Sequence, residues 1–236
     1  MDIYDANATG VSSVQEANKV NPVGFVVRTY FTMAIGLFLS FISSIIASTF
    51  FPHLFYTVEV ALGLLVAEIA VVLIFTFAFK KASRGTVVVL FLLYSLFTGL
   101  SLSSIFIYYD VKTLYLTFMV TALAFGSMAV YGLITKKDIT RFSSFISMGF
   151  IALIIASILG FFIGGWFDAF VCGIAVMFFM GVTAYDSAMI KKYFSFASSE
   201  NELNKLSIYC AMQLYLDFIN IFLRLLRIIA RVRSND

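Results

Sequence analysis

Seven long apolar stretches constrain this chain more than any other feature of its sequence. A helix needs about 20 apolar residues to cross the hydrocarbon core of a bilayer, and each stretch is close to that length. Strands of a membrane barrel would instead alternate polar and apolar residues over about ten positions, which these stretches do not do. We therefore predict an all-α integral membrane protein with seven transmembrane helices, at roughly 28–50, 55–79, 86–107, 113–135, 143–164, 168–190 and 206–230.

Composition supports a membrane class and sets the first residues apart. The chain of 236 residues is 61% hydrophobic and 12% charged, whereas a soluble domain is about 25% charged. The first residues are polar and lack the basic and apolar segments of a cleaved signal peptide. We predict a disordered cytoplasmic tail at 1–27 and a single seven-helix membrane domain at 28–236. The net charge of +3 comes from basic residues beside the spans, so no nucleic-acid partner is expected.

The basic residues between the stretches predict the orientation. The tail and three of the loops carry eleven Lys or Arg residues, whereas the loops of the other side carry only Lys112. The positive-inside rule then places the N-terminus in the cytoplasm. Seven spans would leave a basic C-terminal end outside, against the rule. Either the last segment is re-entrant or its arginines turn inward, and we favour inward-turned arginines.

Polar residues of the last stretch recur every three or four positions, which places them on one face of a helix. A polar stripe on a membrane helix has to face protein or water, so we expect the last helix to be central, with the other six around it. Snorkelling to the interface fits Arg231 and Arg233 but leaves the midspan residues unexplained. The stripe consists of Gln213, Asp217, Asn220, Arg224, Arg227 and Arg231.

Two acidic residues, Asp186 and Asp217, lie inside the sixth and seventh apolar stretches. A carboxylate in a membrane helix costs several kcal/mol unless it is protonated, paired or hydrated, and it marks a functional site by default. A short loop joins these stretches, so we expect antiparallel neighbours that hold both acids at similar depth. Two carboxylates in contact share a proton, and their oxygens suit Ca²⁺ when that proton leaves. The pair is therefore our candidate pH sensor and Ca²⁺ ligand set.

A third acid, Glu68, lies midway along the second stretch. It is either part of an ion path or a neutral, hydrogen-bonded structural residue. Cys172 and Cys210 also fall within predicted spans, where we interpret them as small buried hydrophobes.

Several segments resemble one known family of membrane proteins. AYDSAMIKK at 184–192 and LYLDFINIFLRLLR at 214–227 resemble the paired C-terminal signature of the Bax inhibitor-1 family. TGLSLSSIF at 98–106 and VRTYFTMAIGLFLS at 27–40 are similar to its third-span and first-span motifs. The resemblance covers nearly all of the chain after the tail. It implies a bacterial-type member in the inner (plasma) membrane, a last helix surrounded by the other six, and a pH-sensitive calcium leak.

The resemblance also implies roles for particular residues. The family's di-aspartyl sensor corresponds to Asp186 and Asp217, and the arginine that follows the second aspartate corresponds to Arg227. An arginine near the end of the second span, which latches the acidic pair, has no clean match. Lys80 occupies about that place, with Lys81 and Arg84 close by, and lysine lacks the bidentate fork of arginine. We keep Glu68, Arg227, Lys80, Arg84 and Asn220 as candidates for an ion path or a latch.

Passive Ca²⁺ flux, gated by protons at the aspartate pair, is our first interpretation. It needs the bilayer, Ca²⁺ and protons, with no enzyme activity and no cofactor. The alternative is a non-transporting regulator that binds a membrane protease or a cell-death partner. A remote alternative is an intramembrane aspartyl protease, because Tyr185–Asp186 fits the first motif of that class and a shared proton can activate water. However, LYLD at 214–217 replaces the expected GxGD.

Overall fold

The computed structural model describes residues 21–51, 53, 57–137 and 139–234. Seven helices are long and apolar enough to cross a membrane. A short helix, α5 (Ile105–Tyr108), and a 3₁₀ turn, η1 (Ile139–Phe142), lie in two connections. The described residues contain no strand, which confirms the all-α prediction. The seven helices are α2 (Pro22–Phe50), α3 (Val58–Ala78), α4 (Arg84–Leu102), α6 (Val111–Ile134), α7 (Ser143–Ile163), α8 (Gly165–Phe196) and α9 (Glu200–Ser234).

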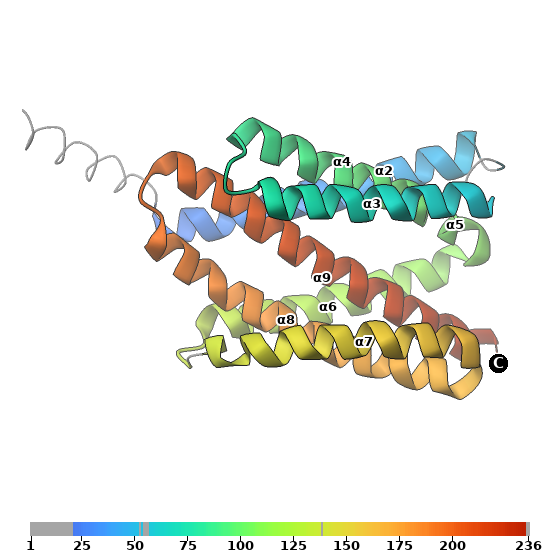
Figure 1. Ribbon diagram of the computed structural model, residues 1–236. Coiled ribbons are helices and arrows are strands. Elements are labelled where there is room, and N and C mark those ends of the chain that lie inside the picture. The colour runs from blue at the N-terminus through green and yellow to red at the C-terminus, as the bar shows by residue number, and fades with distance from the viewer. Residues whose placement is uncertain (1–20, 52, 54–56, 138, 235–236) are drawn as a thin grey trace, which may run out of the picture.

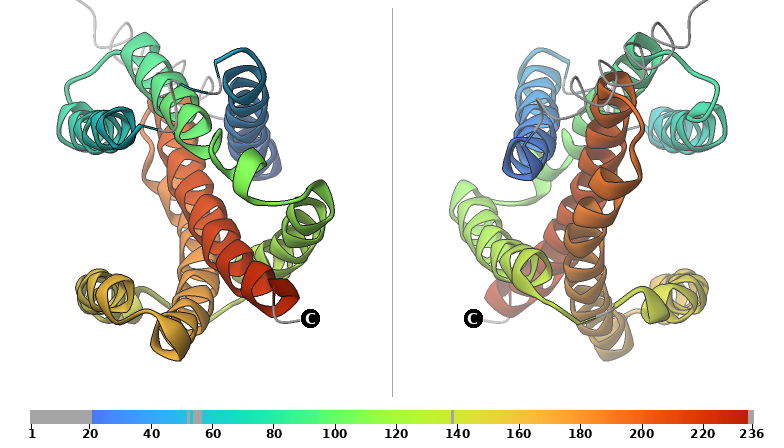
Figure 2. Two further views of the ribbon diagram at one scale, coloured as in Figure 1. Left: turned by 90° about the vertical axis from the view of Figure 1, so that its right-hand side faces the viewer. Right: turned by 90° about the vertical axis from the view of Figure 1, so that its left-hand side faces the viewer.

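The last helix, α9, is the central one, as predicted. It runs diagonally through the molecule, with α2, α3 and α4 on one side and α6, α7 and α8 on the other (Figures 1 and 2). Of its most apolar window 56% is buried, compared with 11% for α3 and for α7. α9 packs directly against α2, α4, α6 and α8, whereas α3 packs mainly on α4 and α7 on α8. The two outer helices reach α9 through side chains: Phe75 of α3 contacts Tyr209, and Ser157 of α7 contacts Arg224.

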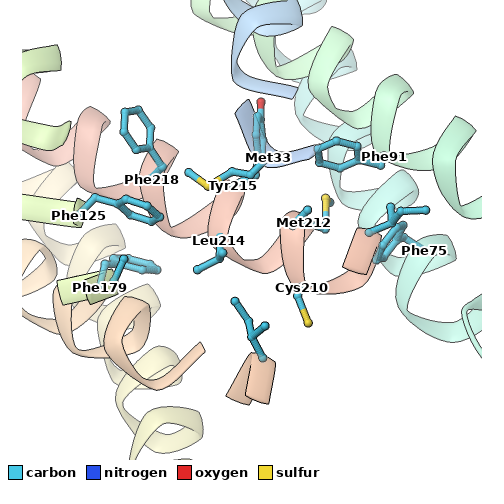
Figure 3. Close-up of a cluster of buried hydrophobic side chains, with 14 of the residues drawn as sticks. Met33, Phe75, Phe91, Phe125, Phe179, Cys210, Met212, Leu214, Tyr215 and Phe218 are labelled. Atoms are coloured by element: carbon cyan, nitrogen blue, oxygen red, sulfur yellow. The ribbon is translucent and has the colours of Figure 1, made fainter. Parts of the chain in front are cut away.

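Ring and thioether side chains from five helices converge on α9 (Figure 3). Phe125 of α6 meets Phe218 edge to face, with 5.5 Å between ring centroids, and Phe91 of α4 meets Tyr215 at 5.9 Å. Such pairs contribute about 0.5–1.5 kcal/mol beyond the burial of their area. Because lipid tails are as apolar as these side chains, the helices associate through this close packing rather than through exclusion of water.

The first helix begins earlier than the sequence predicted. Asn21 caps α2 by accepting a hydrogen bond from the Val23 amide at 3.1 Å, and Pro22 occupies the first helical position. Proline suits that position because its missing amide hydrogen would have no partner there. The predicted boundary of the tail at residue 27 is therefore wrong, since 22–27 are helical. The rest of the predicted tail, 1–20, lies outside the described residues.

Helix ends also differ from prediction at the third, sixth and seventh stretches. α4 ends at Leu102 because the chain turns at Ser103 and Ser104, whose hydroxyls bond to carbonyls three residues back. α8 continues to Phe196, and α9 runs from Glu200 to Ser234. Hydropathy locates only the apolar part of a helix, and these helices continue through charged residues at their ends.

Candidate functional site

Asp217 lies in the middle of α9 and is almost fully buried, with 3% of its surface exposed. Its Oδ2 atom has no hydrogen-bond partner within the described part of the chain. The side chain is close to Thr183 of α8, and the charge of Asp186 on the same helix acts on it. A buried carboxylate oxygen without a partner is costly, so Asp217 is an uncompensated polar group in the middle of the bundle.

Asp186 is partly buried in α8, and the structure brings it together with Asp217 between α8 and α9. The charges of both acids act on the hydroxyl of Tyr30, which belongs to α2. That hydroxyl shares a hydrogen bond of 2.8 Å with Ser187, the residue after Asp186. Three helices that are distant in sequence therefore converge on the acidic pair.

Several hydroxyl side chains lie near the pair. Thr183 and Ser187 are fully buried, and the charge of Asp186 also reaches Tyr193 and Tyr209 on the side of the α8–α9 connection. The described residues contain no group of three or more His, Cys, Asp or Glu side chains that could hold a metal ion. Ca²⁺ takes six to eight oxygen ligands, so these two carboxylates would need hydroxyls and water to complete its coordination.

Close packing of α6 against α8 supports the site from the other side. Gly132 of α6 lies directly against the Ala184 carbonyl and near Ser187. Any side chain at this position would push the two helices apart. The small residue thus holds the backbone on both sides of Asp186 close to α6.

Glu68 is separate from the aspartate pair. Ser101 of α4 donates a hydrogen bond of 2.5 Å to its Oε1 atom, and the charge of Glu68 acts on Tyr94 and Tyr215. Tyr215 in turn shares a bond of 2.7 Å with Ser40 of α2. These contacts form a second polar cluster among α2, α3, α4 and α9. The hydrogen bond from Ser101 to Glu68 is the kind of contact that a structural role for this acid predicts.

The arginines at the end of α9 contact residues of neighbouring helices while their side chains stay partly exposed. Arg227 and Arg231 both pair with Asp168 of α8, at 2.9 and 3.0 Å, and Arg231 also donates to the Gly165 carbonyl at 2.6 Å. Arg224 donates to Ser157 of α7 at 3.0 Å. Arg231 thus has protein partners, and whether it also reaches the membrane interface stays a prediction. Arg233 lies 3.6 Å from Asp110 at the start of α6 and donates to Thr113 at 3.0 Å.

Asp168 is the residue that sequence reasoning missed. It is 6% exposed and lies in the first turn of α8, three residues after Gly165; Gly164 and Gly165 both have positive φ. The sequence did offer a signal for this residue. It is an acid at the start of a helix, and that helix end lies at the same end of the bundle as the C-terminal arginines. Its carboxylate offsets part of the positive charge of Arg227 and Arg231 at this end of the bundle.

None of the candidate latch residues contacts the aspartate pair. Arg227 pairs with Asp168 instead, and Asn220 donates to the Leu216 carbonyl of its own helix at 2.8 Å. Lys80 and Arg84 are exposed at the turn between α3 and α4. Neither has an ion-pair partner among the residues that the structure describes. Within the described part of the chain, no lysine or arginine side chain is therefore paired with Asp186 or Asp217.

A central polar helix that carries a buried acid, enclosed by six other membrane-spanning helices, defines a polytopic α-helical membrane protein. The sequence model of the family described as "Inhibitor of apoptosis-promoting Bax1" matches residues 23–234. The chain therefore belongs to the Bax inhibitor-1 family.

Two bacterial relatives show how far the similarity extends. The chain is 38% identical over 218 residues to inner membrane protein YbhL of Escherichia coli strain K12, covering 89% of this chain and 92% of that protein. It is 35% identical over 217 residues to an uncharacterized protein of Borreliella burgdorferi, covering 90% and 93%. The name of the E. coli relative describes a membrane protein and assigns it no catalytic activity. The similarity therefore extends over almost the full length of both relatives.

Proposed function

We propose that this protein is a pH-sensitive calcium leak channel in which protonation of Asp186 and Asp217 gates passive Ca²⁺ flux. We place it in the inner membrane, as the name of the E. coli relative suggests, with its N-terminus in the cytoplasm. The observation that carries the proposal is the buried Asp217 carboxylate. Its Oδ2 atom has no partner in the described structure, and a second carboxylate acts on it.

The gating step follows from electrostatics at low dielectric. Two neighbouring carboxylates cannot both ionise cheaply, so they hold one proton between them. Loss of that proton leaves two negative charges in the middle of the helix bundle, where a divalent cation is strongly attracted. Tyr30 and Ser187 share a hydrogen bond of 2.8 Å beside the pair, and Thr183 is close to Asp217, so their neutral oxygens are our candidates to complete the coordination of the cation. Asp186 lies on α8 and Asp217 lies on α9. In our proposal, loss of the shared proton therefore changes the distance between these two helices.

Calcium influx into sealed proteoliposomes loaded with a fluorescent Ca²⁺ indicator tests the proposal. The pH series runs from about 5 to 8, where a shared carboxylate proton can exchange. Wild-type protein is expected to pass Ca²⁺ at a rate that changes with pH, and Asp217→Asn to lose that dependence. Glu68→Gln is the matched control, because it neutralises an intramembrane acid in the separate cluster and leaves the pair intact.

Two results would contradict the channel. One is the absence of flux from folded wild-type protein at every pH, which would favour a regulator that acts through a membrane-protein partner. The other is an unchanged pH dependence in Asp217→Asn, which would remove the pair from the mechanism.

A further inference from the structure

An open groove with a volume of about 410 Å³ lies between α7, α8 and α9. Its polar lining consists of Ser157, Asn220, Arg224 and Arg227. Its walls are apolar side chains that point away from the protein core, such as Ile158 and Phe161, which are 53% and 77% exposed. The groove therefore combines cationic groups with an apolar surface that faces the surrounding bilayer.

The positive charge of Arg224 is not balanced by the protein. Its guanidinium donates to the Ser157 hydroxyl, and no carboxylate lies within 4.0 Å of it among the described residues. The nearby Asp168 carboxylate is already divided between Arg227 and Arg231. A guanidinium has five N–H donors, so Arg224 keeps most of its donors available for an anion. An unbalanced charge within a membrane helix is costly, and an anionic ligand would remove that cost.

The position of the groove in the fold indicates which kind of anion it would bind. At one end of the groove Arg227 pairs with Asp168 in the first turn of α8, so this cationic end lies toward the end of the bundle, where lipid headgroups are found. Ser157 lies deeper, about 9 Å from the end of α7 at 1.5 Å rise per residue. Arginine binds phosphate through two parallel hydrogen bonds, and basic pockets between membrane helices hold anionic headgroups. A free phosphate would make no use of the exposed Ile158 and Phe161 walls, whereas an acyl chain would cover them.

We propose that the α7–α9 groove binds an anionic phospholipid, with its phosphate on Arg224 and Arg227 and an acyl chain along α7. The lipid would link α7 to α9, two helices that otherwise make few direct contacts. The inference is independent of the calcium leak, because the groove does not include the aspartate pair.

Fluorescence quenching by brominated lipids tests the groove directly. The chain has one tryptophan, Trp166, so Trp166→Phe combined with Phe161→Trp places a single reporter on the groove wall. This parent protein is reconstituted in vesicles that mix plain phosphatidylcholine with either dibrominated phosphatidylglycerol or dibrominated phosphatidylcholine. The parent is expected to favour phosphatidylglycerol about fivefold, the effect of one arginine near an anionic headgroup.

Charge variants of the parent protein distinguish binding at the groove from general electrostatic attraction to the protein surface. Arg224→Gln is expected to abolish the preference, and Arg224→Lys to keep most of it. Arg233→Gln is the matched control: it removes one positive charge from the same end of α9, but its guanidinium faces Asp110 and Thr113. The control is expected to retain the full preference. Midpoints of thermal unfolding show which variants remain folded.

Three results would overturn the proposal. Equal quenching by the two lipids in the parent would show that the groove does not select a charged headgroup. An equal loss of preference in Arg224→Gln and Arg233→Gln would show diffuse electrostatic attraction instead of a site. Displacement of brominated phosphatidylglycerol by excess inorganic phosphate would show a site for a free anion.

Discussion

Replacing Gly132 with alanine is expected to separate α6 from α8 beside the aspartate pair. A Cβ atom at this position would overlap the Ala184 carbonyl oxygen and lie 2.8 Å from Ser187 Cβ, whereas ordinary contacts of a Cβ are 3.4–4 Å. The obstacle includes backbone, which cannot rotate away, so the helices themselves have to move. Overpacking of this kind costs about 1–3 kcal/mol.

A second glycine of the same helix isolates the packing effect. Nothing lies within 4 Å of the Cβ that alanine would add at Gly126. Alanine is favoured over glycine in a helix by about 1 kcal/mol, and this gain applies to both substitutions. The difference in unfolding free energy between Gly132→Ala and Gly126→Ala is therefore the packing cost alone, about 1–3 kcal/mol.

Thermal unfolding in detergent, followed with a thiol-reactive fluorogenic dye, measures that difference. Cys172 and Cys210 are 0% and 2% exposed, so the dye reports only molecules that have opened. In a domain of this size, 1 kcal/mol corresponds to about 2–4 °C in Tm. Gly132→Ala is expected to unfold at least a few degrees below Gly126→Ala. Equal midpoints would refute the reasoning, since they would show that α6 and α8 do not make this close contact.

Three further changes have defined outcomes. Asp168→Asn removes the charge that two arginines of α9 share, and it is expected to cost about 1.5–3 kcal/mol and to lower the midpoint in the same dye assay. Tyr30→Phe removes the hydrogen bond to Ser187; it is expected to cost about 0.5–1.5 kcal/mol and to shift the pH midpoint of Ca²⁺ flux without abolishing flux. At the start of α6, the hydroxyl of Thr113 donates to Asp110 and holds the pKa of that carboxyl below its ordinary value. The unfolded chain then binds more protons, so this contribution to stability is present above about pH 4 and is lost as the pH falls through the lowered pKa; Asp110→Asn is expected to flatten that acid limb in unfolding scans over a pH series.

The seven helices could be predicted from hydropathy because each needs a continuous apolar run to cross the bilayer. Their ends could not. The early start of α2 depends on capping by Asn21, a signal that hydropathy does not measure, although the order Asn then Pro is readable in the sequence. The turn after Leu102 depends on serine hydroxyls that bond to the backbone, within a stretch that remains apolar overall.

The candidate site shows a similar division. Helical spacing predicts that Asp217, Asn220 and Arg224 share one face of the last helix, and that this face points inward. The partners of that face come from other helices: Asp168 for Arg227, and Ser157 for Arg224. Spacing within one helix carries no information about which distant residues it meets, so these partners emerge only from the packed structure.

The most direct test of the central claim follows proton binding and Ca²⁺ flux in the same reconstituted preparation over the same pH series. Infrared difference spectroscopy detects the carbonyl stretch of a protonated carboxyl group. Our account predicts a band that disappears over the pH interval in which flux changes, and that is absent in Asp217→Asn together with the pH dependence of flux. A band that titrates outside this interval, or a pH-dependent flux that persists in Asp217→Asn, would contradict a gate formed by Asp186 and Asp217.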